Sequence, residues 1–313
     1  MPRTAFTVAH GAAPTRVDRA VAAHLRDQGL DVSNRRAKQL VDERAVRVDG
    51  HPVWKASDTI AAGAVVEVEL PADLATATAP LVDLRDAVIY EDAAVLAINK
   101  PAGLPTHATH DPHRDHAHEA VARLLRERGV EAPYVGIHHR LDVDTSGVLL
   151  FAVDRAANKG LADAFSQRVA RKTYDALCVA APDDSPGTTF VVDNHLGRDR
   201  TSSTARSTAV TSGGDHAHTD FEVRARGLYV ARVTAHPHTG RMHQIRAHLA
   251  ATGRPILGDT LYGGPTTIDG TTVPRLMLHA ARLALPHPVT QAPLVLDAPL
   301  PRDFAALAAL VSR

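Results

Sequence analysis

The sequence predicts an α+β protein made of two domains joined by a linker. Its 313 residues are enough for two domains, and 44% hydrophobic with 22% charged residues is an ordinary globular composition. Residues 71–86 are rich in Ala, Thr and Pro, which is typical of a linker. Apolar residues recur at helical spacing in some segments and alternate in others, so helices and sheet strands are both expected. We therefore predict a small domain at residues 14–70 and a larger one at residues 87–313.

The composition also restricts the location and the partners of the chain. No apolar run approaches the roughly 18 residues of a membrane helix, and no charged region followed by an apolar stretch begins the sequence, so we expect neither a membrane partner nor a secretory signal. Cys178 is the single cysteine, which fits the reducing cytoplasm. The net charge is zero and the pI is near 7.4. A nucleic-acid binder of this composition must therefore concentrate its positive charge locally.

The predicted small domain contains two helices followed by a small sheet. Residues 15–27 carry apolar side chains at helical spacing, and Ser33 is the expected N-cap of a second helix. Residues 46–48 alternate apolar and polar side chains, and Asp-Gly supplies a two-residue turn before the return strand. A further alternating strand is predicted at residues 66–70. Residues 1–13 show no regular pattern, and we predict no element there.

Basic side chains gather in the second half of this small domain. The stretches RVDRAV, SNRRAKQLV and VRVDGHPV, in this order, resemble the RNA-binding domain named after the fourth small-subunit ribosomal protein. The resemblance implies that cations of the second helix and the following turn contact RNA phosphates; the alternative is a solvated helix face. The cations concerned are Arg35, Arg36, Lys38, Arg44 and Arg47.

The larger domain is organised around the stretch HHRLDVDTSG at residues 138–147. The aliphatic residues that follow it, at 148–153, predict a buried strand, and Asp-Thr-Ser-Gly predicts a tight turn. A loop fixed to a core strand in this way can hold a carboxylate and a guanidinium at the floor of a cleft. The alternative is a capped turn in which Asp142 and Asp144 accept hydrogen bonds from the backbone.

Further stretches in a fixed order extend this pattern over residues 85–310. Together with HRLDVDTSG they resemble the large-subunit-type family of RNA pseudouridine synthases, with Met242 and Ala247 as mild departures from the family motif. The stretches are VLAINKPAGL at 95–104, RKTYDAL at 171–177, TGRMHQIRAHL at 239–249, GDTLYGG at 258–264 and LHAARL at 278–283. The resemblance implies the pseudouridine synthase fold, an α+β domain in which a long mixed, mainly antiparallel sheet carries a central cleft.

The resemblance also implies the reaction and the residues that carry it. In this reaction uridine in structured RNA is isomerised to pseudouridine, and nothing is oxidised, so no cofactor is expected. Asp142 is the implied catalytic carboxylate and acts on the sugar as a nucleophile or as a base. Arg246 is expected to pair with Asp142, because an adjacent cation favours the charged form of a carboxylate. Tyr174 is expected to stack on the uracil and to handle its ring proton.

Two more residues receive roles from the same resemblance. Ile245 is expected to close the other face of the base. Arg140 is expected to fill the stack left by the flipped-out uridine, a task that suits a planar cation. Asp144 and residues 258–263 are expected to be structural. Ribosomal RNA is a more plausible substrate than transfer RNA, and we expect the chain to act as a monomer.

Three other functions are the alternatives. Five histidines crowd one loop and suggest a metal-dependent hydrolase, but no His-Glu-x-x-His occurs and their spacing matches no defined catalytic site, so we predict no metal. An aspartic protease is excluded because its motif needs Gly directly after Thr or Ser. A non-catalytic RNA-binding protein is disfavoured because Asp142, Tyr174 and Arg246 occur together. The histidines of that loop are His107, His110, His113, His116 and His118.

Overall fold

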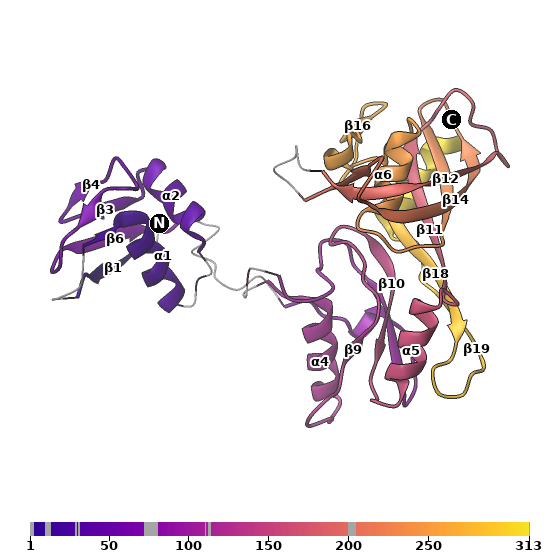
Figure 1. Cartoon of the computed structure of the whole chain (residues 1–313), viewed down its shortest axis with the longest axis horizontal. Coiled ribbons are helices and arrows are strands. Elements are labelled where there is room, and N and C mark those ends of the chain that lie inside the picture. Colours follow the sequence, from indigo (N-terminus) through magenta and orange to yellow (C-terminus); the bar gives the residue numbers. More distant parts are fainter. Residues whose placement is uncertain are drawn as a thin grey trace. The chain divides into compact units, whose positions relative to one another are not determined.

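The protein divides into two compact units, each of which is described by itself (Figure 1). The N-terminal unit comprises Met1–Leu81 and Ala108–Asp115, and the C-terminal unit comprises Val82–His107 and His116–Arg313. Every helix among the described residues is too short or too polar to cross a membrane. The computed structural model describes residues 3–9, 14–28, 30, 32–71, 81–109, 111, 114–199 and 205–312.

The N-terminal unit packs two helices against a small antiparallel sheet. The sheet has the order β1-β6-β3-β4, and β2 pairs separately with β5. Leu25 of the first helix and Leu40 of the second are fully buried together with Val66 and Val68 of the sheet. The elements are α1 (Val17–Asp27), α2 (Asn34–Asp42), β1 (Arg3–Thr7), β2 (Thr15–Arg16), β3 (Val46–Val48), β4 (His51–Pro52), β5 (Thr59–Ile60) and β6 (Val65–Glu69).

Two local predictions in this unit, a helix N-cap and a tight turn, are confirmed. In both, the residue type determines the local backbone conformation. Ser33 caps α2, because its Oγ accepts the Arg36 N–H at 3.1 Å. Asp49 and Gly50 both have positive φ, at 51° and 79°, as a tight two-residue hairpin turn requires. The prediction that residues 1–13 form no helix or strand is wrong, because residues 3–7 form β1. This strand exists through its pairing with β6 along five residues, and a short mixed sequence does not reveal such a partner.

The C-terminal unit is built on one large sheet of eleven strands among the described residues. Its order is β13-β12-β14-β15-β11-β18-β10-β8-β7, with β19 beside β18 and β9 beside β10. Only the pair β10–β18 is parallel in the described part, so the sheet is mixed and mainly antiparallel, as predicted. The strands are β7 (Val88–Glu91), β8 (Val95–Lys100), β9 (Gly136–Ile137), β10 (Ser146–Ala152), β11 (Arg171–Val179), β12 (Thr189–Arg198), β13 (Ser207–Ala209), β14 (Asp215–Arg226), β15 (Val230–Pro237), β18 (Leu278–Pro286) and β19 (Pro293–Asp297), with a separate hairpin of β16 (Thr267–Ile268) and β17 (Thr271–Thr272).

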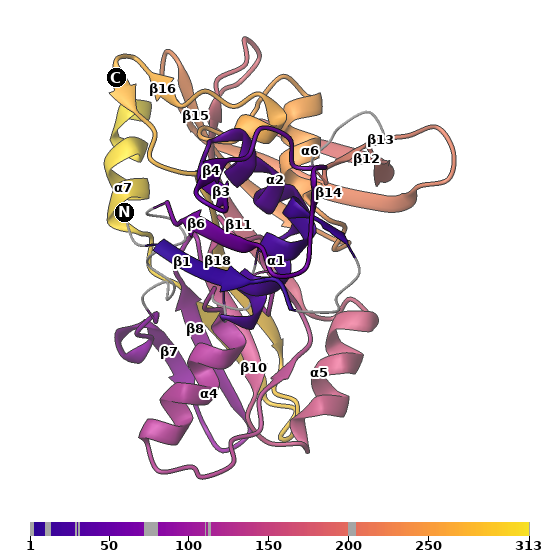
Figure 2. The ribbon, with the colours of Figure 1, turned by 90° about the vertical axis from the view of Figure 1, so that its left-hand side faces the viewer.

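The helices of this unit cover different ends of the sheet. Figure 1 shows α4 beside β9, and Figures 1 and 2 show α5 beside β10; α4 packs in one hydrophobic cluster with residues of β9 and β10, and α6 packs against β14. Residues 72–80 of the expected linker, 71–86, lie outside the described residues, and Leu84 is buried in the core of this unit. The helices are α4 (Ala117–Glu127), α5 (Ala157–Ser166), α6 (Gln244–Ala251), α7 (Arg302–Ala308), and the short 3-10 helices η1 (Arg85–Ala87), η2 (Thr260–Tyr262) and η3 (Ala309–Ser312).

The predicted strand after the Asp-Thr-Ser-Gly turn is an interior strand of the sheet. All seven residues of β10 are buried, and the strand runs between β8 and β18. Gly147 has φ of 117°, and a Cβ atom there would lie 2.2 Å from the Ala280 carbonyl oxygen, so glycine is required where β10 meets β18. Ser146 Oγ and His279 Nδ1 lie 2.9 Å apart across the same junction. The loop that precedes β10 therefore adjoins a closely packed junction of two strands.

Candidate active site

The loop before β10 is tied firmly to the core. Thr106 Oγ1 donates to the Leu141 carbonyl at 2.9 Å and accepts the Leu141 N–H at 3.1 Å. Lys100 is fully buried, and its Nζ donates to the carbonyls of Leu104 and Val143 at 2.7 and 3.0 Å. A buried ammonium is stable only when such acceptors surround it. The carboxylate carried by this loop therefore stands on a rigid support.

The opposite wall of the site begins with the turn into α6, which is held by a buried amide. Gln244 Oε1 accepts from Thr239 Oγ1 at 2.6 Å and from the Arg241 N–H at 3.0 Å. Its Nε2 donates to the His218 carbonyl at 3.0 Å and to Thr219 Oγ1 at 2.8 Å. Two acceptor and two donor positions of one amide are thus used, which fixes the turn to β14.

His243 stands directly before α6 in a left-handed conformation, with φ of 53°. Its Nε2 lies 3.9 Å from Asp142 Oδ2, and its Nδ1 lies 3.3 Å from the Tyr262 hydroxyl. Burial lowers the pKa of the His243 ring; the Asp142 carboxylate opposes this effect and the positive charge of Arg246 reinforces it. Such positive φ values in non-glycine residues gather at functional sites.

Arg246, one turn into α6, is held by two carboxylates. Its Nε and Nη2 donate to the two oxygens of Asp259 at 2.7 and 2.8 Å, and its Nη1 donates to Asp142 Oδ2 at 3.4 Å. The ring of Tyr262 lies 5.2 Å from the guanidinium carbon. Burial alone lowers the pKa of Arg246, but the hydrogen bonds and charges of Asp259 and then Asp142 outweigh it and raise the pKa. The guanidinium is therefore a permanent cation with a fixed orientation.

Apolar side chains form the remaining walls. Tyr174, on β11, packs against two hydrophobic clusters, and Ile245 is buried with 7% of its surface exposed. Burial raises the pKa of the Tyr174 phenol, and the nearby Asp142 carboxylate raises it further, so the hydroxyl stays protonated at neutral pH. Lys172 lies two residues before Tyr174 on the same strand face, and burial lowers the pKa of its ammonium.

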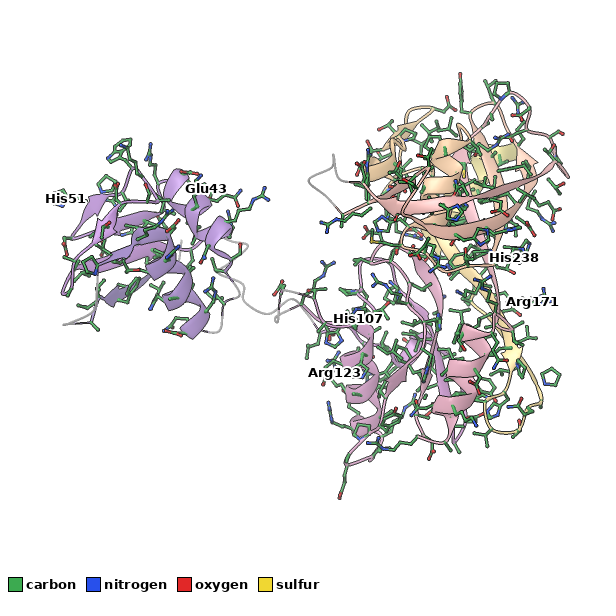
Figure 3. The ribbon with its side chains drawn as sticks, in the orientation of Figure 1. Glu43, His51, His107, Arg123, Arg171 and His238 are labelled. Carbon is green, nitrogen blue, oxygen red and sulfur yellow. The ribbon has the colours of Figure 1, made fainter. Side chains whose placement is uncertain are left out.

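These groups line a pocket of about 590 Å³. His138, Leu141 and Leu278 contribute to the lining, and His238, labelled in Figure 3, lines it just after β15. Asp142 is the one carboxylate among the described lining residues. The lining cations are Arg140, Arg168, Lys172, Arg241 and Arg246. A single carboxylate inside a basic pocket with aromatic and aliphatic walls suits a flat, uncharged ring on a phosphate chain.

The similarity of the chain to known proteins decides its family. A family profile described as RNA pseudouridylate synthase matches residues 94–251. An RNA pseudouridine synthase of Mycobacterium tuberculosis is 33% identical over 316 residues, which cover 97% of this chain and 96% of that protein. The chain belongs to the RNA pseudouridine synthase family.

Two further proteins that are similar to this chain are also named pseudouridine synthases or pseudouridylate synthases. The ribosomal large subunit pseudouridine synthase C of Vibrio vulnificus is 35% identical over 88% of this chain and 87% of its own length. The solved structure of human RNA pseudouridylate synthase domain containing 4 superposes with a TM-score of 0.60 at 28% identity, and covers 72% of this chain and 94% of that one. The synthase is accordingly an isomerase that converts uridine to pseudouridine in RNA, and its fold is the predicted one.

The structure of the synthase brings the five predicted pocket residues together. Asp142, Arg140, Tyr174, Ile245 and Arg246 all line the one pocket, although they come from three separate stretches of sequence. The expected contact between Arg246 and Asp142 is present but is the longest of the Arg246 hydrogen bonds.

Sequence patterns did not indicate four residues of the site: Lys172 and His243, which line the pocket, and Asp259 and Tyr262, which contact Arg246 from outside the lining. Lys172 carried a signal, because it alternates with Tyr174 along one strand and must face the same side. His243 stood inside the matched motif without a distinctive spacing. Asp259 and Tyr262 fell in the stretch assigned to structure, and only folding brings them to Arg246.

The five predicted RNA-contacting cations lie in the N-terminal unit, apart from the pocket residues in sequence. Arg36 pairs with Glu43 at 3.0 Å. The guanidinium carbon of Arg44 lies 3.8 Å from the ring centre of Trp54, whose surface is 66% exposed. Arg35, Arg36 and Lys38 are on α2, and Arg44 and Arg47 follow it.

Two described histidines of the crowded loop, His116 and His118, make local structural contacts. His116 caps α4, since its Nδ1 accepts the Glu119 N–H at 3.2 Å, and His118 Nε2 lies 3.0 Å from the Val135 carbonyl. His110 and His113 lie outside the described residues. Neither the comparisons nor these contacts support a hydrolase or a non-catalytic protein.

Proposed function

We propose that Asp142 is the catalytic carboxylate of this synthase and that Arg246 pairs with it and orients it. The observation that carries this proposal is the position of Asp142: it is the one lining carboxylate among the described residues, and Arg246 donates to it at 3.4 Å. Isomerisation breaks the bond from the anomeric carbon of the sugar to a ring nitrogen. It then forms a bond to a ring carbon, which loses its proton. Attack by a carboxylate on the sugar, or removal of a sugar proton, requires the ionised form.

Tyr174 and Ile245 are proposed to hold the two faces of the target uracil. Both side chains line the pocket beside Asp142 and offer flat or apolar surface. The raised pKa of the Tyr174 hydroxyl keeps it protonated. A neutral phenol takes the ring proton only while it passes its own proton on, so we assign Tyr174 first to stacking and second to this relay.

Arg140 is proposed to occupy the space that the target base leaves in the RNA stack. Its side chain is exposed and lines the mouth of the pocket, next to the Asp142 loop. A planar guanidinium stacks on neighbouring bases and stays charged, which suits this position. The uncharged base then enters the pocket while its phosphates remain near the lining cations.

The N-terminal unit is proposed to bind RNA through Arg35, Arg36, Lys38, Arg44 and Arg47. Arg35, Lys38, Arg44 and Arg47 are exposed, and Arg36 is half-buried beside Glu43. Trp54 with Arg44 stacked on it adds an aromatic platform of the kind that single-stranded bases use. Cations that neutralise phosphates supply affinity, and an exposed ring adds stacking.

Ribosomal RNA is the proposed substrate. Several relatives at 32–35% identity carry the name ribosomal large subunit pseudouridine synthase, C or D.

We place the enzyme in the cytoplasm because its single cysteine is a buried thiol. We also propose that the enzyme acts as a monomer.

Pseudouridine mapping tests this function. Total RNA from cells with and without the gene is compared, and a uridine of large-subunit RNA is expected to lose its modification when the gene is absent. The purified chain should then restore pseudouridine at that position in unmodified transcript. A missing position in transfer RNA alone would contradict the ribosomal assignment while keeping the reaction.

A further inference from the structure

Five titratable side chains gather on the outer face of three neighbouring strands. On β14, His216, His218 and Asp220 alternate with Ala217 and Phe221, which are buried in the core. Residues spaced by two along a strand share one face, so the three polar side chains point the same way. Asp193 of β12 pairs with His218, and the His238 N–H donates to the His218 carbonyl at 2.9 Å. We call Asp193, His216, His218, Asp220 and His238 the histidine–aspartate cluster.

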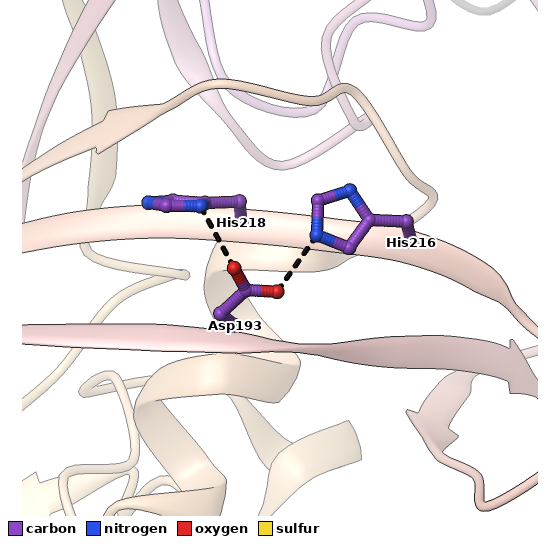
Figure 4. A group of neighbouring side chains, drawn as sticks. All are labelled: Asp193, His216 and His218. Carbon is purple, nitrogen blue, oxygen red and sulfur yellow. Dashed lines mark hydrogen bonds and ion pairs between the residues drawn. The ribbon is translucent and has the colours of Figure 1, made fainter.

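The cluster forms two groups of three possible metal ligands that share His218. In the first, drawn in Figure 4, Asp193 lies 2.7 Å from His216 Nε2 and 3.1 Å from His218 Nδ1. In the second, Asp220 lies 2.9 Å from His218 Nε2 and 2.7 Å from His238 Nε2. Within each group all ligand atoms lie within 4.8 Å of one another. Ligands of a tetrahedral zinc ion lie roughly 3.3–3.4 Å apart, so small side-chain rotations suffice.

The ring of His218 poses a chemical problem that a metal ion solves. Its Nδ1 faces a carboxylate oxygen of Asp193, and its Nε2 faces a carboxylate oxygen of Asp220. A neutral imidazole carries a single N–H, so one of its nitrogens directs a lone pair at a carboxylate. A second proton or a bound cation removes this repulsion. A cation bound by a ring nitrogen and a carboxylate oxygen turns the same contact into attraction.

The ligand types select the ion. Two imidazoles and one carboxylate are a zinc ligand set, and they leave a fourth position for water. Calcium and magnesium prefer oxygen ligands and do not suit two ring nitrogens.

We propose that the histidine–aspartate cluster binds a divalent transition metal of the zinc class, with His218 as the ligand common to both groups. The five residues of the cluster have no role in the reaction proposed above. His238 also lines the pocket, so an ion in the second group lies at the rim of the active site. The long strands β12 and β14, paired over eight residues, hold the ligands in place before the ion arrives.

Zinc titration of the chelator-treated, full-length protein tests the proposal. Competition with a chromophoric zinc indicator measures affinity and stoichiometry, and thermal unfolding with and without zinc gives a second readout. Wild-type protein should bind zinc and unfold at a higher temperature when zinc is present. His218→Ala should unfold at the wild-type temperature without zinc, because the side chain is at the surface. It should bind zinc at least about tenfold more weakly, and zinc should no longer raise its unfolding temperature.

The matched control is His107→Ala, which removes an exposed histidine of the crowded loop and should leave zinc binding unchanged. Equal zinc affinity in wild type and His218→Ala would overturn the proposal, because the ion would then bind elsewhere among the 19 histidines. Absence of zinc binding by the wild type would also overturn it and would indicate that a second proton on His218 links the two carboxylates.

Discussion

Arg246 is bound at two points by Asp259 and at one point by Asp142. The Asp259 contacts measure 2.7 and 2.8 Å, and the Asp142 contact measures 3.4 Å. Asp259 is 2% exposed, so the two-point contact is shielded from water, whereas Asp142 stands at the pocket surface. The two carboxylates therefore differ: Asp259 fixes the guanidinium through two hydrogen bonds, whereas Asp142 lines the pocket and makes one longer contact with it.

We predict that Asp259→Asn lowers the rate although Asp259 does not line the pocket. An amide cannot match the two-point bond to Arg246, so the guanidinium shifts away from Asp142. A shift of about 1 Å costs about 10²-fold in rate. Loss of one partner of a buried ion pair also costs about 3–5 kcal/mol in the free energy of unfolding. Single-turnover kinetics and urea unfolding measure the two effects.

The variant Asp259→Glu serves as the control for charge. It keeps the carboxylate and should recover part of the lost rate, whereas a role limited to packing predicts a larger loss for Glu than for Asn, because Glu adds a methylene group at a buried position. A wild-type rate in Asp259→Asn would show that Arg246 needs no second anchor.

Tyr174→Phe separates stacking from proton transfer. The phenylalanine ring keeps the wall of the pocket, so RNA binding should stay within about twofold of wild type, because the aromatic face carries the stacking contribution. Loss of the hydroxyl should slow turnover by about 10²–10⁴-fold if the ring proton passes through it. Rate measurements at saturating RNA decide the matter. Turnover equal to that of the wild type would confine Tyr174 to packing and stacking.

The buried ring of His248 predicts a loss of stability in acid. His248 is fully buried, its Nδ1 lies 3.0 Å from Thr219 Oγ1, and burial lowers its pKa to about 4. The unfolded chain, with an ordinary histidine pKa of about 6.5, binds the proton first. Stability is therefore complete above pH 6.5 and declines as the pH falls toward 4, by about 2 kcal/mol at pH 5.

Urea unfolding followed by circular dichroism at pH 7 and pH 5 measures this difference. The variant His248→Asn, which cannot gain a proton, should lose less stability between the two values than the wild type does. An identical loss in both proteins would assign the acid sensitivity to other groups.

Local sequence patterns were sufficient to predict the structure where a residue determines the conformation of its own backbone. Ser33 caps α2 through its own hydroxyl, and Gly147 is the residue that the crowded junction with Ala280 tolerates. The aliphatic run after Gly147 is buried on both faces, and such a run indicates a central strand without knowledge of its neighbours. Residues from four of the ordered motifs, at 138–147, 171–177, 239–249 and 278–283, line the pocket.

Contacts that depend on tertiary structure could not be predicted in this way. Asp259 reaches Arg246 because Gly258 and Gly264 allow the chain to fold back closely, and a Cβ atom at Gly258 would lie 1.9 Å from the Arg275 carbonyl oxygen. His216 and His218 alternate with other residues along β14, but the residues that they contact, Asp193 and His238, come from other segments of the chain. Strand β1 likewise exists through its pairing with β6.

Deletion of residues 1–75 should weaken RNA binding far more than it slows the chemical step. The proposed RNA-contacting cations lie before residue 48, and the pocket residues lie after residue 137. On single-stranded RNA, the logarithm of affinity falls by about 0.7 per phosphate contact for each tenfold rise in salt. If about three to five contacts are lost, the slope should flatten by about 2–3.5. Salt titrations that give the same slope for both proteins would exclude this unit from RNA binding.

The most direct test of the account is the pseudouridine-forming rate of Asp142→Asn beside that of Asp144→Asn. Asp142 lines the pocket and contacts Arg246, whereas Asp144 is exposed and lies outside the described lining of the pocket. The amide at position 142 removes the charge that the reaction requires and keeps the shape of the side chain. We predict a folded Asp142→Asn protein that binds RNA without detectable turnover, and an Asp144→Asn protein with the wild-type rate. Turnover by Asp142→Asn at a rate comparable with wild type would contradict the assignment of the catalytic carboxylate.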